Sequence, residues 1–92
     1  MTYQILPYTK NKAKLLGVQV NHSKNPKKKL DVYYNGNFIC SIGAIGYKDY
    51  PTYFKENGKE YAEKRRKLYK LRHEKNRHKI GTPSFFADNL LW

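Results

Sequence analysis

Apolar and polar positions alternate with a period of two in the first half of the chain, as they do in strands that bury one face. Leu16, Val18 and Val20 occupy every second position, which predicts a strand over about residues 14–21. The preceding residues, 1–13, include a proline and have a weaker pattern. We therefore expect them to be flexible or to form an edge strand.

Asn35-Gly36 lies between two β-rich runs, 29–34 and 37–43. An Asn-Gly pair in this place predicts a two-residue hairpin, because both residues of a type I′ turn need positive φ angles. The implied register pairs Tyr33 with Phe38 on one face and Val32 with Ile39 on the other. Together with the first strand, the hairpin predicts a three-stranded antiparallel meander.

The second half of the chain changes to a helical pattern. The segment from Lys59 to Lys79 has ten Lys or Arg and three Glu in 21 residues, has no Pro or Gly, and is followed by Gly81. Most of its residues are good helix formers, and a glycine just beyond them is typical of a helix end. We predict one long basic helix over residues 59–79.

A helical-wheel projection gives this helix one broad apolar face, which a core is expected to cover. The face consists of Tyr61, Ala62, Leu68, Tyr69 and Leu71. Arg65 and Arg72 lie inside the same arc, two turns apart. Either their aliphatic stems cover the core while the guanidinium groups reach its edge, or they form a rigid pair that binds phosphate or carboxylate.

Two short helices are predicted on either side of the long one, over about 51–56 and 83–91. Asp49 as a cap or Pro51 in the first turn begins the first, and Thr82-Pro83 begins the second. The second helix is strongly apolar, with two Phe, two Leu and Trp92 near the end of the chain. We expect these residues to fold back over the core, with an exposed apolar segment for a protein partner as the alternative.

Taken together, these elements predict an α+β fold in a single domain, residues 1–92, with helices covering one face of the sheet. Nine Tyr, four Phe and one Trp supply much of the apolar area for one core. The chain has no run of about 18 apolar residues, and its first residues lack the basic-then-apolar pattern of a secretion signal. We therefore predict neither a membrane span nor secretion.

The charge is the most informative part of the composition. With 19 Lys and Arg against 7 Asp and Glu, the chain has a formal net charge of +12. A polyanion relieves the self-repulsion of such a charge, so nucleic acid is the leading partner and an anionic membrane surface the second. The candidate phosphate ligands come from the loop before the hairpin and from the long helix: Lys24, Lys27, Lys28, Lys29, Arg65, Arg66, Lys67, Lys70, Arg72 and Arg77.

Residues typical of catalysis or of metal binding are scattered. The carboxylates are dispersed, and His73 and His78 are five residues apart, so they point to different sides of a helix. The single cysteine excludes an internal disulfide and a cysteine-based zinc site. Gly43-Ala44-Ile45-Gly46 matches the GxxG of KH domains, but it follows a strand and is better explained as a strand-to-helix turn. We predict no enzyme, no metal and no cofactor.

Three segments of the sequence carry a resemblance, in addition to the Asn-Gly hairpin. They are Gly43-Ala-Ile-Gly-Tyr-Lys-Asp-Tyr50, Arg65-Arg-Lys-Leu-Tyr-Lys-Leu-Arg-His-Glu-Lys75 and Gly81-Thr-Pro-Ser-Phe-Phe-Ala-Asp-Asn-Leu-Leu-Trp92. Over about residues 30–92 the chain resembles a family of small basic proteins of unassigned function encoded by giant DNA viruses, including Marseillevirus-like ones. The resemblance implies a location inside an infected host cell, in the virus factory or nucleus, or in the virion.

The sequence thus predicts a non-enzymatic nucleic-acid-binding protein that contacts phosphates of duplex DNA with little sequence specificity. DNA is preferred to RNA only because of the viral resemblance. The alternative is a protein–protein adaptor or virion component that binds a viral or host protein through its Tyr-rich surface or its apolar C-terminal segment.

Overall fold

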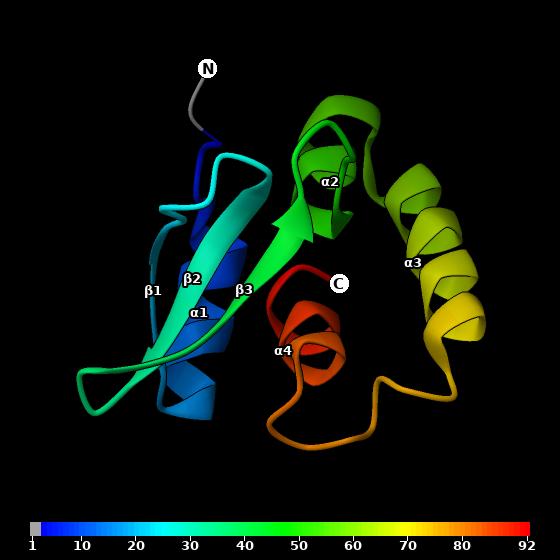
Figure 1. Ribbon diagram of the computed structural model, residues 1–92. Helices are drawn as coiled ribbons and strands as arrows, with labels where there is room; N and C mark the ends of the chain where they lie inside the picture. The colour runs from blue at the N-terminus through cyan, green and yellow to red at the C-terminus, as the bar shows by residue number, and fades with distance from the viewer. Residues whose placement is uncertain (1–2) are drawn as a thin grey trace.

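An antiparallel sheet and a set of helices form the two sides of the molecule (Figure 1). The computed structural model describes residues 3–92. In chain order the elements are α1 (Pro7–Leu16), β1 (Gln19–His22), β2 (Lys28–Tyr34), β3 (Asn37–Ala44), α2 (Tyr50–Asn57), α3 (Lys59–His73) and α4 (Pro83–Leu90). The predicted α+β class and three-stranded antiparallel meander are confirmed, with strand order β1-β2-β3.

The hairpin between β2 and β3 forms as its turn sequence predicts. Asn35 has a φ of 49° and Gly36 a φ of 80°, so both turn residues are in the left-handed region. Tyr33 pairs with Phe38, as expected. Val32, however, pairs with Cys40 rather than Ile39, because the ladder has an irregularity between Val32 and Tyr33. An extra residue of this kind moves all following pairs by one position.

The N-terminal segment differs from the prediction. The proline within residues 1–13 does not limit an edge strand; it is the first residue of α1, where its missing N–H costs nothing. The helix runs to Leu16 and ends at Gly17, so the strand expected over 14–21 is reduced to β1, Gln19–His22. Leu16 therefore belongs to a helix, and its apparent alternation with Val18 and Val20 was coincidental.

The core lies between one face of the sheet and the helices α1 and α4. Its buried members are Ala13, Val18, Leu30, Val32, Ile42, Phe86, Leu90 and Leu91. Thr9 of α1 donates its hydroxyl hydrogen to the backbone oxygen of Leu90 at 2.9 Å, which joins the two helices. The C-terminal segment therefore folds back over the core as predicted, and α4 begins with the predicted Thr82 cap and Pro83.

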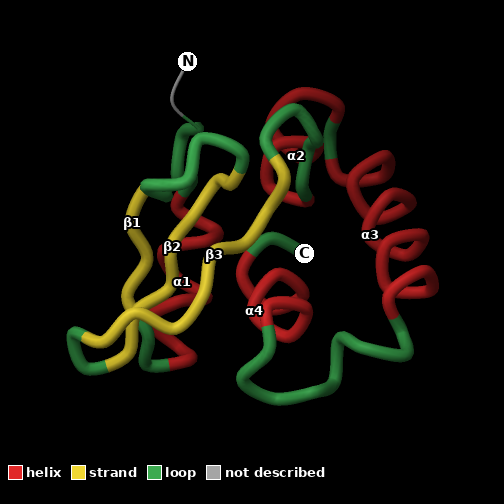
Figure 2. Tube along the Cα trace, in the orientation of Figure 1, coloured by secondary structure: helices red, strands yellow, loops and turns green. Residues whose placement is uncertain are grey.

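The helix α3 is shorter than predicted and buries a different face. It ends at His73, and residues 74–82 form turns that lead back to α4 (Figure 2). Of the expected apolar face, only Ala62 and Tyr69 are buried, whereas Leu71 is 67% exposed and Leu68 48% exposed. The expected core does not cover this face, because α3 lies at the outer side of the molecule against α2 (Figure 1).

The helix α2 positions the loop that leaves the sheet. Asp49 caps its N-terminus by accepting a hydrogen bond from the backbone N–H of Thr52 at 3.1 Å, and Pro51 occupies the first turn, as predicted. The backbone N–H of Tyr50 donates to the backbone oxygen of Leu91 at 3.0 Å. This bond fixes the start of α2 to the end of the C-terminal segment.

Candidate nucleic-acid interface

The carboxylates of the protein are almost all engaged internally. Within the described residues, six of the seven Asp and Glu side chains have a hydrogen-bonded or ion-paired partner. These contacts engage only five of the 19 Lys and Arg side chains as ion-pair partners, namely Lys29, Lys48, Arg66, Lys70 and Arg77. The excess positive charge is therefore carried by side chains that have no carboxylate beside them.

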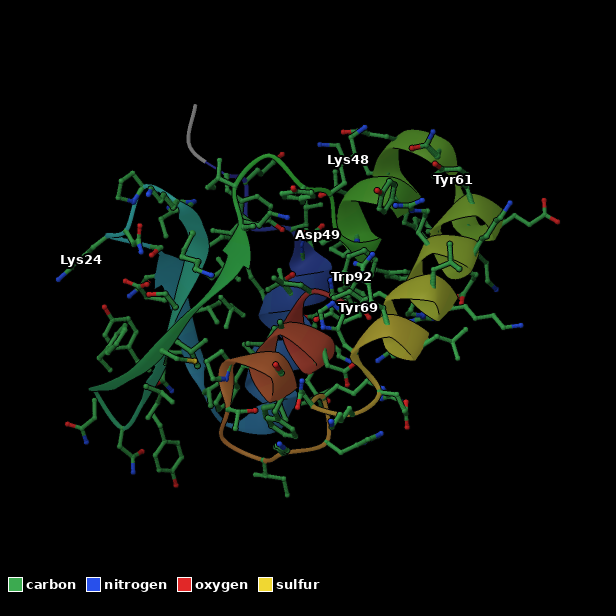
Figure 3. All side chains as sticks on the ribbon, turned by 45° about the vertical axis from the view of Figure 1, so that its right-hand side comes forward. Lys24, Lys48, Asp49, Tyr61, Tyr69 and Trp92 are labelled. Carbon is green, nitrogen blue, oxygen red and sulfur yellow. The ribbon has the colours of Figure 1, made fainter. Side chains whose placement is uncertain are left out.

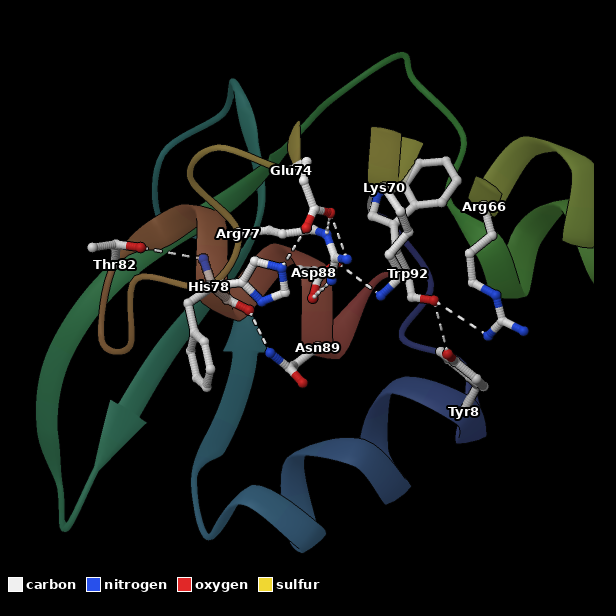
Figure 4. A network of polar contacts seen from close by, with 11 residues as sticks. Tyr8, Arg66, Lys70, Glu74, Arg77, His78, Thr82, Asp88, Asn89 and Trp92 are labelled. Carbon is white, nitrogen blue, oxygen red and sulfur yellow. Dashed lines mark hydrogen bonds and ion pairs between the residues drawn. The ribbon is translucent and has the colours of Figure 1, made fainter. Parts of the chain in front are cut away.

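A polar network around Asp88 occupies part of the predicted basic helix (Figure 4). Lys70 donates to Asp88 at 2.8 Å, and Arg77 lies 3.5 Å from the same carboxylate and 2.7 Å from Glu74. Asp88 is buried, so this network joins α3 and the following turns to α4. Lys70 and Arg77 were predicted as phosphate ligands, but in the structure their charges are compensated by these carboxylates.

Arg66 is similarly compensated. Its guanidinium forms two hydrogen bonds of 2.7 Å with Glu63 and lies 4.1 Å from the ring centroid of Tyr50. The hydrogen bonds from Arg66, with one from Tyr50, lower the pKa of Glu63. A guanidinium held between a carboxylate and an aromatic face has a structural role, which separates Arg66 from the exposed lysines.

Lys29 is buried, contrary to the prediction that it contributes to a basic loop. Its Nζ lies 3.0 Å from Asp49 Oδ2 and 5.0 Å from the ring centroid of Tyr3. Tyr3 donates its hydroxyl hydrogen to the same carboxylate, and burial, followed by the charge of Asp49, raises the tyrosine pKa. A Lys paired inside the fold in this way has no free charge for phosphate.

The loop between β1 and β2 is ordered by a buried carboxylate. Asp31 accepts hydrogen bonds from Ser23 Oγ at 2.6 Å, from Ser41 Oγ at 2.5 Å and from the backbone N–H of Lys24 at 3.1 Å. Asn25 Oδ1 accepts a further hydrogen bond from the backbone N–H of Lys27 at 2.9 Å. The exposed side chains of Lys24, Lys27 and Lys28 therefore extend from a defined turn.

A groove opens between α3 on one side and β3 with the loop that follows it on the other. Its volume is about 480 Å³. We call it the basic groove, because among the described residues that line it five are Lys or Arg and none is Asp or Glu. The five are Lys28, Lys29, Lys48, Arg65 and Arg72. Gly43 of β3 permits close packing at its base, since a Cβ there would come within 2.9 Å of Leu91 and Lys29.

Aromatic rings form one side of the basic groove. Tyr69 stacks on Trp92, with ring centroids 4.4 Å apart and planes inclined by 8°, and His73 stacks on the same tyrosine at 4.3 Å. Tyr53 lies 6.2 Å from Trp92. Figure 3 shows Tyr69 and Trp92 together between α3 and α4, whereas Lys24 points into solvent on the far side of the sheet. Burial, reinforced by Arg72, lowers the pKa of His73, so the imidazole is neutral at pH 7.

Arg65 and Arg72 carry the free charge of α3 into the groove. The guanidinium of Arg65 lies 5.3 Å from the ring centroid of Tyr53, and that of Arg72 lies 6.0 Å from the centroid of Tyr69. Neither has an ion-paired carboxylate among the described residues. Arg72 Nε also donates to His73 Nε2 at 3.4 Å, so each guanidinium contacts an aromatic ring at the groove.

The structure thus divides the predicted ligands among several places. Arg65, Arg72 and Lys28 line the groove, Lys24 and Lys27 lie on the neighbouring loop, and Lys67 points outward from α3. Sequence reasoning missed Lys48 and the rings of Tyr53, Tyr69 and Trp92. The spacing of Arg65, Tyr69 and Arg72 (i, i+4, i+7) places them on one helix face, and this signal was available in the sequence.

The fold and the groove define a small α+β protein with a basic groove that is lined by aromatic side chains. Neither a protein-family model nor a curated protein nor a solved structure was found to match the chain. Within residues 3–92, none of the helices has both the length and the apolarity needed to cross a bilayer. The same part of the chain brings no three His, Cys, Asp or Glu side chains together as metal ligands.

Proposed function

We propose that this protein binds nucleic acid without catalysing a reaction, mainly through contacts with phosphates and with little base specificity. The observation that supports this best is the charge of the basic groove, where Lys28, Lys48, Arg65 and Arg72 converge and no carboxylate lines the walls among the described residues. Lys28, Arg65 and Arg72 have no ion-paired carboxylate among the described residues, and Lys48 has only an exposed pair with Glu56. Such cations attract the phosphate backbone and release its counterions, which gives affinity independent of sequence.

The absence of catalysis in this proposal is supported by the hydrogen bonds that the buried carboxylates already make within the fold. Asp31, Asp49 and Asp88 each accept hydrogen bonds that fix a loop, a helix start or a helix contact. A general base needs a lone pair within reach of a substrate proton. Carboxylates that already hold the fold together are poor candidates for that role.

The viral resemblance supports DNA ahead of RNA and a location inside an infected host cell, in the virus factory, the nucleus or the virion. The predicted phosphate contacts came in part from a single long basic helix over residues 59–79. That premise changes, because α3 ends at His73 and three of its expected ligands form ion pairs.

The salt dependence of binding tests the proposed function. The logarithm of the association constant is expected to fall linearly with the logarithm of salt concentration, with a slope of about −0.7 to −0.9 per phosphate contacted. Lys27, Lys28, Lys48, Arg65 and Arg72 predict on the order of three to five contacts. Reversing the charge of Lys28 and Arg72 with glutamate is expected to flatten the slope, whereas the same changes at Lys10 and Lys14 of α1 leave it nearly unchanged.

A second candidate function, a protein-interaction module, is favoured by the outer face of α3. Leu68 and Leu71 are exposed there beside Lys64, Lys67 and Lys75. The surrounding lysines oppose self-association and fit a partner segment that is both apolar and acidic. Binding of an acidic amphipathic peptide that is abolished by Leu68→Asp, with nucleic-acid binding absent, would replace the first function by this one.

A further inference from the structure

The shape of the basic groove bears on which form of nucleic acid it accepts. Its volume of about 480 Å³ falls within the roughly 300–1,000 Å³ of sites that enclose small molecules. A nucleotide within one strand fits such a groove, whereas the convex surface of a duplex reaches only its rim. We propose that the groove binds single-stranded nucleic acid, with phosphates on its cations and a base against Tyr47. This inference rests on the nucleic-acid binding proposed above.

On the α3 side of the groove, two arginines are spaced along the direction in which a nucleic-acid strand would lie. Arg65 and Arg72 are seven residues apart, which at about 1.5 Å per residue separates them by roughly 10 Å along the helix. Each guanidinium lies near a tyrosine ring, and Arg72 Nε also contacts His73 Nε2 at 3.4 Å, so the aromatic side chains favour one orientation before a ligand arrives. Pre-positioned guanidinium groups bind phosphate through paired N–H donors and also offer a flat face to an unstacked base.

The opposite wall supplies an aromatic ring that the fold does not use. Tyr47 lies in the loop after β3, lines the groove, and is 75% exposed. Lys48 follows it and Lys28 lies on the same side of the groove. An exposed ring beside cations is the usual arrangement for stacking one base of a single strand. Bases of a duplex already stack on their neighbours and cannot present a face to Tyr47.

The rim requires little rearrangement to accept phosphates. Arg65 and Arg72 have no ion-paired carboxylate within the described chain, and the Lys48–Glu56 pair is about half exposed on both sides. Exposed pairs of this kind contribute little and exchange readily. A strand therefore gains its phosphate contacts without displacing a buried carboxylate.

Competition between single strands and duplexes tests this inference. The probe is a fluorescently labelled oligothymidylate bound to the full chain, displaced by unlabelled oligothymidylate or by a duplex with the same number of nucleotides. We expect the single strand to compete at least tenfold better. Tyr47→Ala is expected to weaken oligothymidylate binding by about five- to a hundredfold, the usual effect of losing one stacked base, and to leave the melting temperature unchanged because the ring is exposed.

A matched pair of variants separates the groove from charge alone. Arg65→Ala with Arg72→Ala and Lys64→Ala with Lys67→Ala each remove two positive charges from α3. The first pair faces the groove and the second faces away from it. We expect the arginine pair to weaken oligothymidylate binding at least tenfold and the lysine pair by no more than about threefold, the size of a general charge effect.

The outcomes distinguish this inference from the function on which it rests. Equal competition by the duplex, with Tyr47→Ala binding as the wild type, overturns the single-strand inference and leaves nucleic-acid binding intact. Displacement by polyglutamate as effective as by oligothymidylate also overturns it, since charge alone then accounts for binding. No measurable binding of either nucleic acid overturns both.

Discussion

At the scale of single residues, Asp31 has the most consequence for the shape of the basic loop. Its carboxylate is buried and accepts three hydrogen bonds, from Ser23, Ser41 and the backbone of Lys24. Burial alone would raise the pKa of Asp31, but these hydrogen bonds outweigh it and the pKa is lowered below its ordinary value of 3.8. A lowered pKa in the folded state means that the ionised group stabilises the fold.

This stabilisation is present above the unfolded-state pKa and is lost as the pH falls through the folded-state pKa. We expect Asp31→Asn to lower the melting temperature at about pH 5 and the difference from the wild type to shrink towards about pH 2. Glu56→Gln removes the same charge from an exposed pair and is the control, with little change at any pH. Thermal melting across this range checks the prediction, and a difference that grows with acidity contradicts it.

The turn of the hairpin gives a second residue-scale prediction. Gly36 has a φ of 80° with nothing near its missing Cβ, so Gly36→Ala changes only the backbone energy. We expect a loss of about 1–2 kcal/mol, the cost of a left-handed conformation for a residue with a Cβ. Asn37→Ala, at an exposed position in β3, is the control. Chemical denaturation measures both, and equal stabilities would show that the turn is not formed as described.

Some of the site was predictable residue by residue. A helical wheel singles out Arg65 and Arg72, because charged residues are unusual on an apolar helix face. Both line the groove. The same reasoning failed for Lys29, which appeared to be one of four equivalent lysines. Its burial depends on Asp49, twenty residues away, and no local pattern encodes such a partner.

At the scale of elements, turn and cap signals predicted better than periodicity did. Asn35-Gly36, Asp49 and Thr82-Pro83 all mark the boundaries that they were expected to mark. These signals depend on the local backbone, which the sequence specifies directly. Periodicity depends on what packs against an element, and so α1 was missed and the apolar face of α3 was misplaced.

The end of α3 shows how tertiary contacts override propensity. The residues after His73 are acceptable helix formers, yet they turn back towards α4. Arg77 thereby reaches both Glu74 and the buried Asp88. Helix propensity amounts to less than about 1 kcal/mol per residue, whereas a buried carboxylate without a cationic partner costs more. The ion pair with Asp88 therefore outweighs the helix propensity of the residues after His73.

Two leucines test the revised packing of the elements. Leu90 of α4 is fully buried, whereas Leu71 of α3 is 67% exposed. We expect Leu90→Ala to reduce the free energy of unfolding by about 2–5 kcal/mol and Leu71→Ala to change it by less than about 0.5 kcal/mol. Urea denaturation of both variants measures this. A large loss of unfolding free energy for Leu71→Ala would show that the apolar face of α3 is buried, as the sequence predicted.

At the scale of the whole molecule, the net charge of +12 is a cost in the absence of a partner. Six of seven carboxylates are already engaged within the described residues, so they do little to screen the remaining lysines. Repulsion among like charges destabilises a compact state and is screened by salt. The stability of the free protein and its affinity for a polyanion should therefore respond to salt in opposite directions.

We expect the melting temperature of the free protein to rise between about 10 and 150 mM sodium chloride, because the Debye length falls from about 30 to 8 Å. Lys64→Gln with Lys67→Gln, which lowers the charge away from the groove, should reduce this rise. Differential scanning fluorimetry without nucleic acid measures it. A melting temperature independent of salt would show that self-repulsion is not a significant term.

Nucleic-acid binding in the basic groove is tested most directly by mapping amide chemical shifts during titration with a short oligothymidylate. We predict that the largest shifts occur at Lys28, Tyr47, Lys48, Arg65 and Arg72, with little change at Lys10 and Lys14 of α1, and that they diminish as salt is raised. Shifts that centre on Leu68 and Leu71, or an absence of salt-dependent shifts at the groove, would contradict this account.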